Sequence, residues 1–411
     1  MKHFLADFPT IDVLFKEMQD LPIPEYREAN CHVHTPYSFS SFADMDDIFR
    51  KAANENIAVL GINDFYVTNG YDTFQKGCVA NKIFPLFNIE FIGLIKEAQK
   101  NGIRINDPDN PGRVYFCGKG LDYPFHPGLF TGITLKNVIK ENQNQIRAMV
   151  AKVNSLIEKQ HPKLKLSYES IKEKYAKDIV NERHIAEAIR ILATKHFTDE
   201  DERRVFVETI FDGKKSLYMS DSAAAFENEI RSNLLKSGGA AFIEENGKSF
   251  PELEKIIKII VKAGGIPCYP VILDDASGKY TEFESDQKKL LNSLRELNIG
   301  CIELITGRNE AKRLKNFVEF FHKNGFVITF GSAHNTMEMA PLAISARGQI
   351  PLDASLKKIA WEGACVIAAH QFLRIDGRQG FAVNDGEIIE KQKQDLARLG
   401  QMVIEYFLNY R

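Results

Sequence analysis

Short apolar runs alternate with helix-like segments in the first third of the chain. The apolar runs lie at 29–34, 57–62, 84–92 and 112–120. The segment 43–56 between the first two runs opens with acidic residues, and its apolar positions recur every three to four residues, as in a helix that covers a sheet. This alternation predicts βα units and a parallel sheet with helices on its faces.

The middle of the chain follows a different pattern. From 135 to 262 nearly every segment has helical spacing, and no apolar run is long enough to belong to a sheet. Strand–helix alternation then resumes, with strands predicted at 263–272, 300–307 and 325–335 and helices at 308–323, 354–373 and 386–408. We therefore predict one α/β unit, residues 1–134 and 263–411, interrupted by a helical insertion at 135–262.

Composition sharpens this division. The chain has 411 residues, 44% hydrophobic and 26% charged, as in a globular protein with a substantial core. Without the helical block, roughly 280 residues remain, close to the ~250 of one (β/α) barrel. The 53 basic and 55 acidic residues give a net charge of −2, which argues against a nucleic-acid or membrane-surface ligand and favours a small anionic substrate held by local groups.

Other features of the sequence indicate the compartment. No run approaches the ~18 apolar residues of a membrane span, and the first residues do not have the pattern of a signal peptide. The six cysteines are scattered without CxxC spacing, which is typical of free thiols in a reducing compartment. We expect a cytoplasmic protein, and the sequence leaves its oligomeric state open.

Candidate chemistry begins with His32 and His34, at the end of the first predicted strand. Residues two apart in a strand face the same side, so the two imidazoles suit neighbouring positions on one metal ion. Strand C-termini are also where α/β barrels place their active sites. Taken alone, two hydrogen-bonded histidines at a loop explain the pattern equally well.

Three further strand ends provide potential ligands. Asp64, Glu90 and His334 each lie in or just after an apolar run, where a buried polar group needs a partner. Singly, Asp64 could cap a turn, Glu90 could form a salt bridge, and His334 could cap a helix. Together with the two histidines, they favour a metal site.

In this order the motifs resemble those of the PHP (polymerase and histidinol phosphatase) superfamily. CHVHTPYS and the strand ending in IND are similar to the family's opening HxH pattern and its strand ending in Thr-Asp-His. Later strands of the family resemble FPLFNIEF, VYFCGKG, AGGIPCYP, CIELITG and FGSAHN. The helix ERHIAEAIRILATKHF is similar to part of an insertion in members that act on nucleotides. The resemblance spans about 29–345 and implies a distorted (β/α)7 barrel with two or three metal ions that hydrolyse phosphate esters.

The resemblance transfers only some of the family's ligands. His32, His34 and Glu90 match them, Asp64 matches the Asp of Thr-Asp-His, and His334 stands one residue before the usual final His. Other ligand-like positions hold residues of a different kind: Phe39, Phe65, Tyr115, Tyr269 and Ala333. Phe cannot coordinate a metal, and neutral Tyr is a poor ligand.

The retained set therefore predicts a single divalent ion (Zn, Mn or Fe) held by His32, His34 and Glu90. Asp64 or His334 would act as general base or extra ligand.

Other residues are candidates for substrate binding. Tyr115 and Tyr269 suit a flat or sugar-like ligand. Arg308 and His126 lie near predicted strand ends and could bind an anionic group, with a solvated loop residue as the alternative for each. The sequence thus predicts a PHP-type metal-dependent hydrolase, a phosphoesterase for a small phosphorylated metabolite or nucleotide. The alternatives are a catalytically degenerate PHP-fold module that binds a ligand or partner, and chemistry on a sugar or uronate-like substrate.

Overall fold

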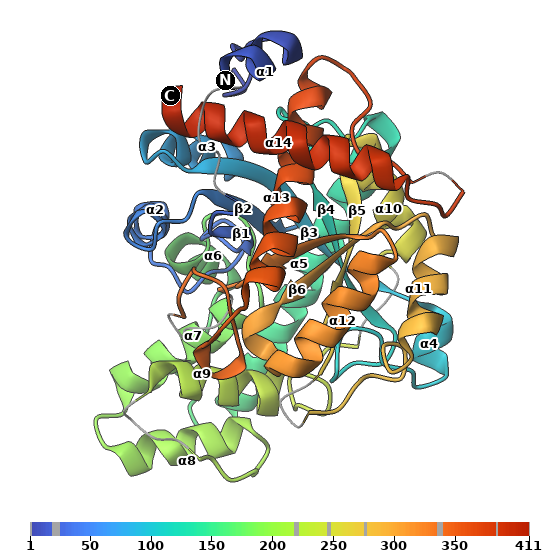
Figure 1. Ribbon diagram of the computed structural model, residues 1–411. Helices are drawn as coiled ribbons and strands as arrows, with labels where there is room; N and C mark the ends of the chain where they lie inside the picture. Colours follow the sequence, from blue (N-terminus) through green and yellow to red (C-terminus); the bar gives the residue numbers. More distant parts are fainter. Residues whose placement is uncertain are drawn as a thin grey trace.

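A seven-stranded sheet forms the centre of the computed structural model, which describes residues 2–18, 25–217, 222–244, 248–274, 278–334, 340–383 and 385–410. The strands follow one another in sequence order across the sheet (Figure 1). They are β1 (Ala29–Val33), β2 (Val59–Phe65), β3 (Phe84–Leu94), β4 (Arg113–Lys119), β5 (Ile266–Val271), β6 (Cys301–Ile305) and β7 (Val327–Gly331). They lie within a few residues of the predicted apolar runs.

The sheet curves until its first and last strands meet. A parallel bridge joins Val33 to Ala333. Across it, the backbone N–H of Ala333 donates to His32 O, and the N–H of His34 donates to Ala333 O, each at 2.9 Å. The α/β fold with a nearly closed seven-stranded barrel is therefore confirmed.

One strand departs from the predicted parallel arrangement. β4 runs antiparallel to both β3 and β5, whereas the other neighbouring pairs are parallel. The connection before β4 contains only the short helix α4 (Lys96–Lys100). A parallel return needs a crossover that runs back along the sheet, and a five-residue helix is too short for it. The prediction of a wholly parallel sheet is wrong at this strand.

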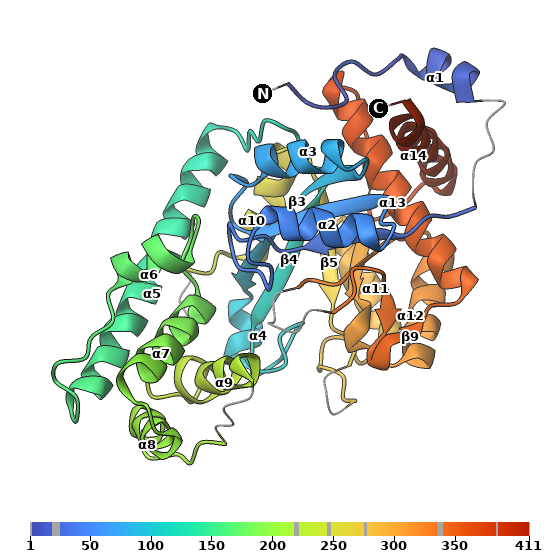
Figure 2. The same cartoon turned by 90° about the vertical axis from the view of Figure 1, so that its left-hand side faces the viewer.

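Helices cover the outside of the barrel (Figure 2). They are α2 (Met45–Asn54), α3 (Tyr71–Ala80), α10 (Leu253–Lys262), α11 (Gln287–Glu296), α12 (Ala311–Lys323), α13 (Ala354–Ile375) and α14 (Glu390–Tyr410), and α1 (Ile11–Met18) packs on α14. Helix α13 lies between the sheet and α14, and most of its residues are buried. Its close approach to β7 depends on Gly363, where a Cβ would lie 1.9 Å from Ile328 O.

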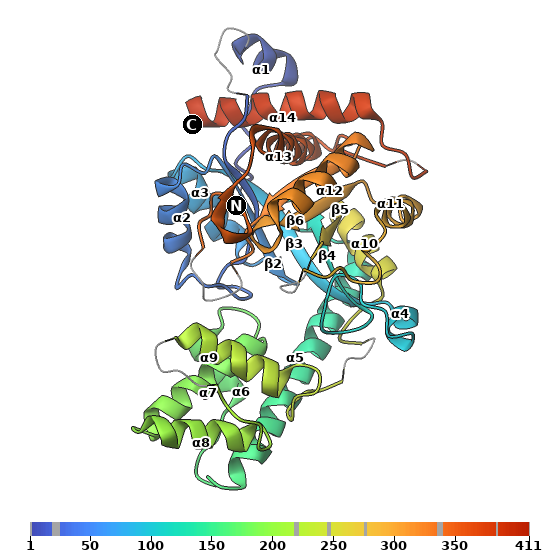
Figure 3. The ribbon, with the colours of Figure 1, turned by 60° about the horizontal axis from the view of Figure 1, so that its bottom comes forward.

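A helical lobe projects from the barrel, below it in Figure 3. It consists of α5 (Leu129–Glu158), α6 (Tyr168–Tyr175), α7 (Glu182–His196), α8 (Glu200–Ile210), α9 (Ala223–Ile230) and the π-helical turn Arg231–Leu235. These helices share an apolar core of their own. Helix α10 lies in the range predicted as the insertion, yet Ile256 and Ile260 pack on Gly93 of β3 and Gly118 of β4. The separately packed lobe therefore ends before α10.

Small elements complete the described chain. β8 (Ser345–Ala346) pairs with β9 (Ile350–Pro351), and 3-10 turns lie at Thr306–Arg308 and Arg347–Gln349. Among the helices in the described ranges, none combines the length and the apolar character needed to cross a membrane.

Candidate metal centre

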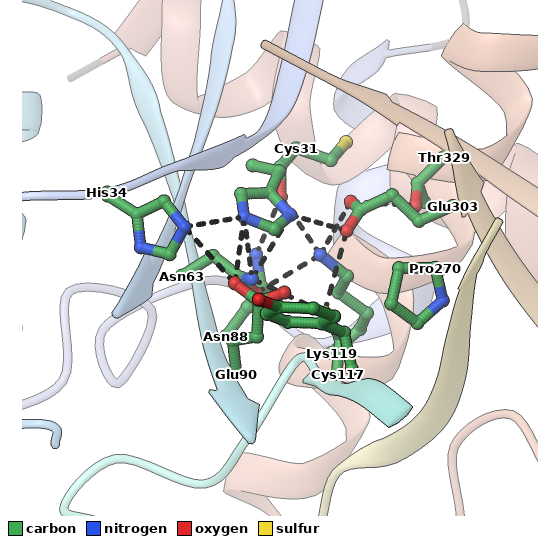
Figure 4. A network of polar contacts seen from close by, with 12 residues as sticks. Cys31, His34, Asn63, Asn88, Glu90, Cys117, Lys119, Pro270, Glu303 and Thr329 are labelled. Atoms are coloured by element: carbon green, nitrogen blue, oxygen red, sulfur yellow. Dashed lines mark hydrogen bonds and ion pairs between the residues drawn. The ribbon is translucent and has the colours of Figure 1, made fainter. Parts of the chain in front are cut away.

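His32, His34 and Glu90 meet at the end of the barrel where β1 and β3 place them. Their side chains are buried, with 2%, 0% and 5% of their surface exposed. Glu90 Oε2 lies 3.1 Å from His34 Nε2 and 3.4 Å from His32 Nε2, and the two Nε2 atoms are 3.3 Å apart (Figure 4). Three potential ligand atoms therefore converge on one point.

This arrangement fits a divalent cation. Ligands about 2.0–2.1 Å from a tetrahedral zinc ion lie about 3.4 Å from one another, close to the separations of these three atoms. Two histidines and one glutamate are a common donor set of catalytic zinc sites, which keep a further position open. His32, His34 and Glu90, called the metal cluster below, therefore have the donor atoms of a metal-binding site.

The protonation states of two of the three residues, His34 and Glu90, also suit a metal. Burial lowers the pKa of His34 to about 4. Burial alone would raise the pKa of Glu90, but His32 and His34 outweigh it and lower that pKa to about 2. Burial also acts to lower the pKa of His32, yet Glu303 and Glu90 raise it overall. Near neutral pH the cluster thus contains an anionic carboxylate and a neutral imidazole, the forms that bind metals.

A second polar group lies against the other nitrogen of His32. Glu303 on β6 has Oε2 at 2.6 Å from His32 Nδ1 and Oε1 at 2.6 Å from Lys119 Nζ. Asn63 and Cys117 complete the group. The sequence prediction did not include Glu303 or Asn63 in the site. The available signal was a charged residue inside the apolar strand CIELI, since a buried charge requires a partner.

Asp64 lies beside this cluster but faces a different element. Its Oδ1 accepts hydrogen bonds from Thr35 N and Ser38 Oγ, each at 2.7 Å, and its Oδ2 accepts one from Thr35 Oγ1 at 2.5 Å. Burial raises the pKa of Asp64 to about 7, against the effect of these bonds. The carboxylate holds the turn after β1 and is not brought to the metal cluster.

His334 is likewise engaged elsewhere. Its Nδ1 lies 2.6 Å from Ser332 Oγ, its Nε2 lies 2.8 Å from Ala340 O, and its ring stacks on Phe42. Both ring nitrogens therefore have partners within the loop after β7. The structure does not bring His334 together with His32, His34 and Glu90.

The four predicted substrate-binding residues divide into two pairs. Tyr115 and Arg308 line a cavity of about 360 Å³ that also contains the metal cluster. Tyr269 is buried and donates its hydroxyl to Glu284 Oε1 at 2.9 Å, away from that cavity. His126 is exposed on the segment before α5 and does not line the cavity.

Aromatic side chains form part of the cavity wall. The Phe65 ring stacks on the imidazole of His34, with ring centres 4.6 Å apart, and Tyr115 lies 6.2 Å from Phe65. Phe39 lines the same cavity. The substituted ligand-like positions 39, 65 and 115 thus give the cavity apolar faces, and Ala333 also lines it.

Arginines form another part of the wall. Arg183 opens α7 and is buried over the Phe39 ring, 4.7 Å from its centre. Burial, with the nearby charges of Arg231 and Arg308, lowers the pKa of Arg183 to about 9. All three arginines line the cavity, together with the acidic residues Asp107, Asp109 and Glu182. Guanidinium groups therefore lie near the metal cluster.

Comparisons with known proteins agree with this fold. The family model of the PHP domain matches residues 30–203. An amidohydrolase from Chromobacterium violaceum, solved with bound sulfate and no metal, has 14% identity and a TM-score of 0.51, over 81% of this chain and 96% of that one. A candidate metal-dependent phosphoesterase from Bifidobacterium adolescentis has 12% identity and a TM-score of 0.52, over 82% of this chain and 96% of that one.

At these identities the two structures show a shared fold. Among curated proteins, none matches the sequence. The family match begins at β1 and includes the strands that provide His32, His34 and Glu90. Residues 30–203 therefore match the PHP domain.

Proposed function

We propose that this protein is a metal-dependent phosphoesterase that acts on a small phosphorylated molecule, such as a nucleotide, with one divalent cation. One observation supports this most directly. The ligand atoms of His32, His34 and Glu90 converge in a cavity whose wall includes four arginines, among them Arg183, Arg231 and Arg308. Metal ligands beside several guanidinium groups suit a phosphate group.

The arginines provide the anion site of this proposal. Arg183, Arg231 and Arg308 lie close enough for the latter two to lower the pKa of Arg183. A phosphate dianion between them would reduce their mutual repulsion. Guanidinium groups also bind phosphate oxygens in pairs, which fixes the orientation of the substrate.

The aromatic residues indicate the chemistry of the part of the substrate that carries the phosphate group. Phe39, Phe65 and Tyr115 line the cavity, and aromatic side chains bind flat or sugar-like groups and exclude water. A cation held by the cluster would supply positive charge to the phosphoryl oxygens and lower the pKa of water. Glu90 and His34 contribute by holding it in a buried pocket.

We do not propose Asp64 or His334, the two residues that the sequence predicts as a general base, as the group that transfers protons. Each oxygen of Asp64 accepts at least one hydrogen bond from the turn after β1. Both ring nitrogens of His334 have partners in its own loop. We propose that Asp64 positions that turn, which directly follows His34.

Phosphate release provides the test. The purified protein, supplied in turn with Mn²⁺, Zn²⁺ and Fe²⁺, is assayed with p-nitrophenyl phosphate, nucleoside monophosphates and sugar phosphates. We expect release with at least one metal, and a loss of about 100-fold or more in His34→Ala, because a metal ligand is removed. His322→Ala, on the surface of α12, is the matched control and keeps the parent rate. No release with any metal, or equal rates in His34→Ala and the parent, would contradict the proposal.

The aromatic substitutions also favour a second candidate, a PHP-fold module that binds a ligand without turnover. Phe65 occupies space against His34 where the family resemblance implies another metal ligand. Under this alternative, a phosphorylated compound raises the melting temperature of the protein while no phosphate is released. Arg183→Ala should abolish that stabilisation, and sugar acids in the same screen test the third alternative.

A further inference from the structure

A chain of buried charged groups leads away from the metal cluster through His32. Glu303 Oε2 lies 2.6 Å from His32 Nδ1, and Glu303 Oε1 accepts hydrogen bonds from Lys119 Nζ at 2.6 Å and from Thr329 Oγ1 at 3.2 Å. Glu303 and Lys119 have no exposed surface. A lysine and a glutamate so deeply buried need a reason beyond general stability, because desolvation offsets most of what their pairing contributes.

The geometry gives that reason. Glu303 can only accept from His32 Nδ1, so the proton of a neutral His32 stays on Nδ1 and the lone pair stays on Nε2. Nε2 is the atom that faces His34 and Glu90. We propose that Glu303 is a positioning residue that directs His32 Nε2 at the cation, and that Lys119 holds Glu303 in place. The inference rests on the proposed function, since it concerns the same metal centre.

Asn63 contacts the His32 ring from the neighbouring strand. The Lys119 ammonium can only donate hydrogen bonds, and its Nζ donates one to Asn63 Oδ1 at 3.2 Å. This contact fixes the orientation of the amide and turns Nδ2 toward the imidazole, 3.1 Å from each ring nitrogen of His32. Lys119 thus constrains the His32 ring through two neighbours, Glu303 and Asn63.

The same contacts argue against a second metal ion. His32, Cys117 and Glu303 also lie close enough together to form a metal-binding group. The ammonium of Lys119, however, already pairs with Glu303 at 2.6 Å. A divalent ion there would share a low-dielectric interior with this ammonium, and like charges at such distances repel strongly. The ammonium of Lys119 therefore provides, beside Glu303, the positive charge that a second metal ion would otherwise provide.

Zinc affinity tests the inference without relying on activity. The dissociation constant for Zn²⁺ is measured by competition with a chromophoric chelator in the parent and in Glu303→Gln. We expect binding about 10–100-fold weaker in the variant, the usual effect of removing the carboxylate behind a ligating histidine. Co²⁺ in place of Zn²⁺ should show altered visible absorption bands in Glu303→Gln, because the His32 ligand is reoriented.

Glu405→Gln is the matched control. Glu405 is also a buried glutamate paired with a basic residue, Arg27, at 2.5 and 2.7 Å, but it lies on α14. Its substitution removes one charge of a buried pair without touching a metal ligand, so Zn²⁺ affinity should stay within about twofold of the parent.

A double variant covers the case in which Glu303→Gln fails to fold. Lys119→Met/Glu303→Gln removes both charges with little change in shape, and such replacements are often tolerated. We expect the double variant to fold and to show the same weakened Zn²⁺ binding. Parent-like affinity in either folded variant would overturn the inference alone. A parent that binds neither Zn²⁺ nor Co²⁺ would overturn the proposed function and the inference together.

Discussion

Gly331, the last residue of β7, lies against His32 of the metal cluster, where a larger side chain would not fit. A Cβ at this position would lie 2.2 Å from His32 Cβ and 3.1 Å from His32 Cα. Both distances involve the base of the His32 residue, which cannot swing aside. The position of His32 therefore depends on a glycine across the barrel seam.

We predict that Gly331→Ala displaces His32 and weakens Zn²⁺ binding by about tenfold or more, as loss of ligand support does. Gly307→Ala is the control, because nothing lies within 4 Å of a Cβ there. Equal Zn²⁺ affinity in both variants, measured by the same chelator competition, would show that His32 does not depend on this contact.

Some of the candidate site could be predicted from residues alone. His32, His34 and Glu90 follow from spacing and strand ends, and the structure brings them together. Asp64 illustrates the limit. Adjacent residues of a strand face opposite sides, and Asn63 faces His32, so Asp64 faces the turn outside. The end of a predicted strand indicates how far along the barrel a residue lies. It does not indicate which of two adjacent residues, here Asn63 and Asp64, has its side chain inside the barrel.

Glu303 and Lys119 show another limit. The two residues are 184 positions apart along the chain, and their pairing follows from the barrel's closure. β6 by itself shows one charged residue among apolar ones, and β4 has a charged residue at each end, with no indication of the partner in either strand.

At the scale of elements, helix α7 joins the lobe to the barrel. Asn181 caps the helix by accepting a hydrogen bond from Arg183 N at 3.0 Å, and His184 Nδ1 accepts one from Asn181 N at 3.1 Å. Asn181 Nδ2 also donates to Ser38 O at 2.9 Å, in the turn after β1. The cap thus places Arg183 over the cavity.

We predict that Asn181→Ala lowers stability by about 1 kcal/mol, as loss of an N-cap does. It should also raise KM for a phosphorylated substrate by about fivefold, which corresponds to about 1 kcal/mol of binding. Ser167→Ala removes the cap of α6 in the same lobe, where Ser167 accepts from Ser170 N at 3.4 Å. This control should lower the melting temperature but leave KM unchanged. A raised KM in both variants would mean that loosening of the lobe, rather than the Ser38 contact, is responsible.

Element positions were more predictable than their directions. The seven strands lie close to the predicted apolar runs because buried strands are continuous apolar segments. The direction of β4 depends on the length of the connection from β3. The sequence pattern gives little indication of the short helix α4 in that connection. The helical spacing of α10 likewise does not distinguish a helix that covers the barrel from one that belongs to the lobe.

Stability of the whole molecule should depend on acid pH through buried histidines. His370 of α13 is 4% exposed, its Nε2 lies 2.6 Å from Gly264 O, and its Nδ1 accepts from Phe381 N at 3.0 Å. Burial lowers its pKa to about 4. The unfolded value is about 6.5, so between these values the unfolded chain holds a proton that the folded chain lacks. Stability present above pH 6.5 is therefore lost as the pH falls toward 4.

His370→Gln should flatten this dependence. Glutamine can donate to Gly264 O and accept from Phe381 N, but it does not titrate. One proton contributes a slope of up to about 1.4 kcal/mol per pH unit. Urea unfolding between pH 4 and 7 measures it, and an equal slope in parent and variant would rule out His370 as a source.

The central claim for the whole molecule is one divalent ion per chain at His32, His34 and Glu90. The fold brings these residues together, while aromatic side chains and Lys119 occupy the neighbouring positions. The most direct test is metal analysis of the purified protein, with anomalous scattering from crystals to locate each ion. We predict one ion per chain between these three side chains, and its absence from His34→Ala. No bound ion, or two or more ions per chain, would contradict this account.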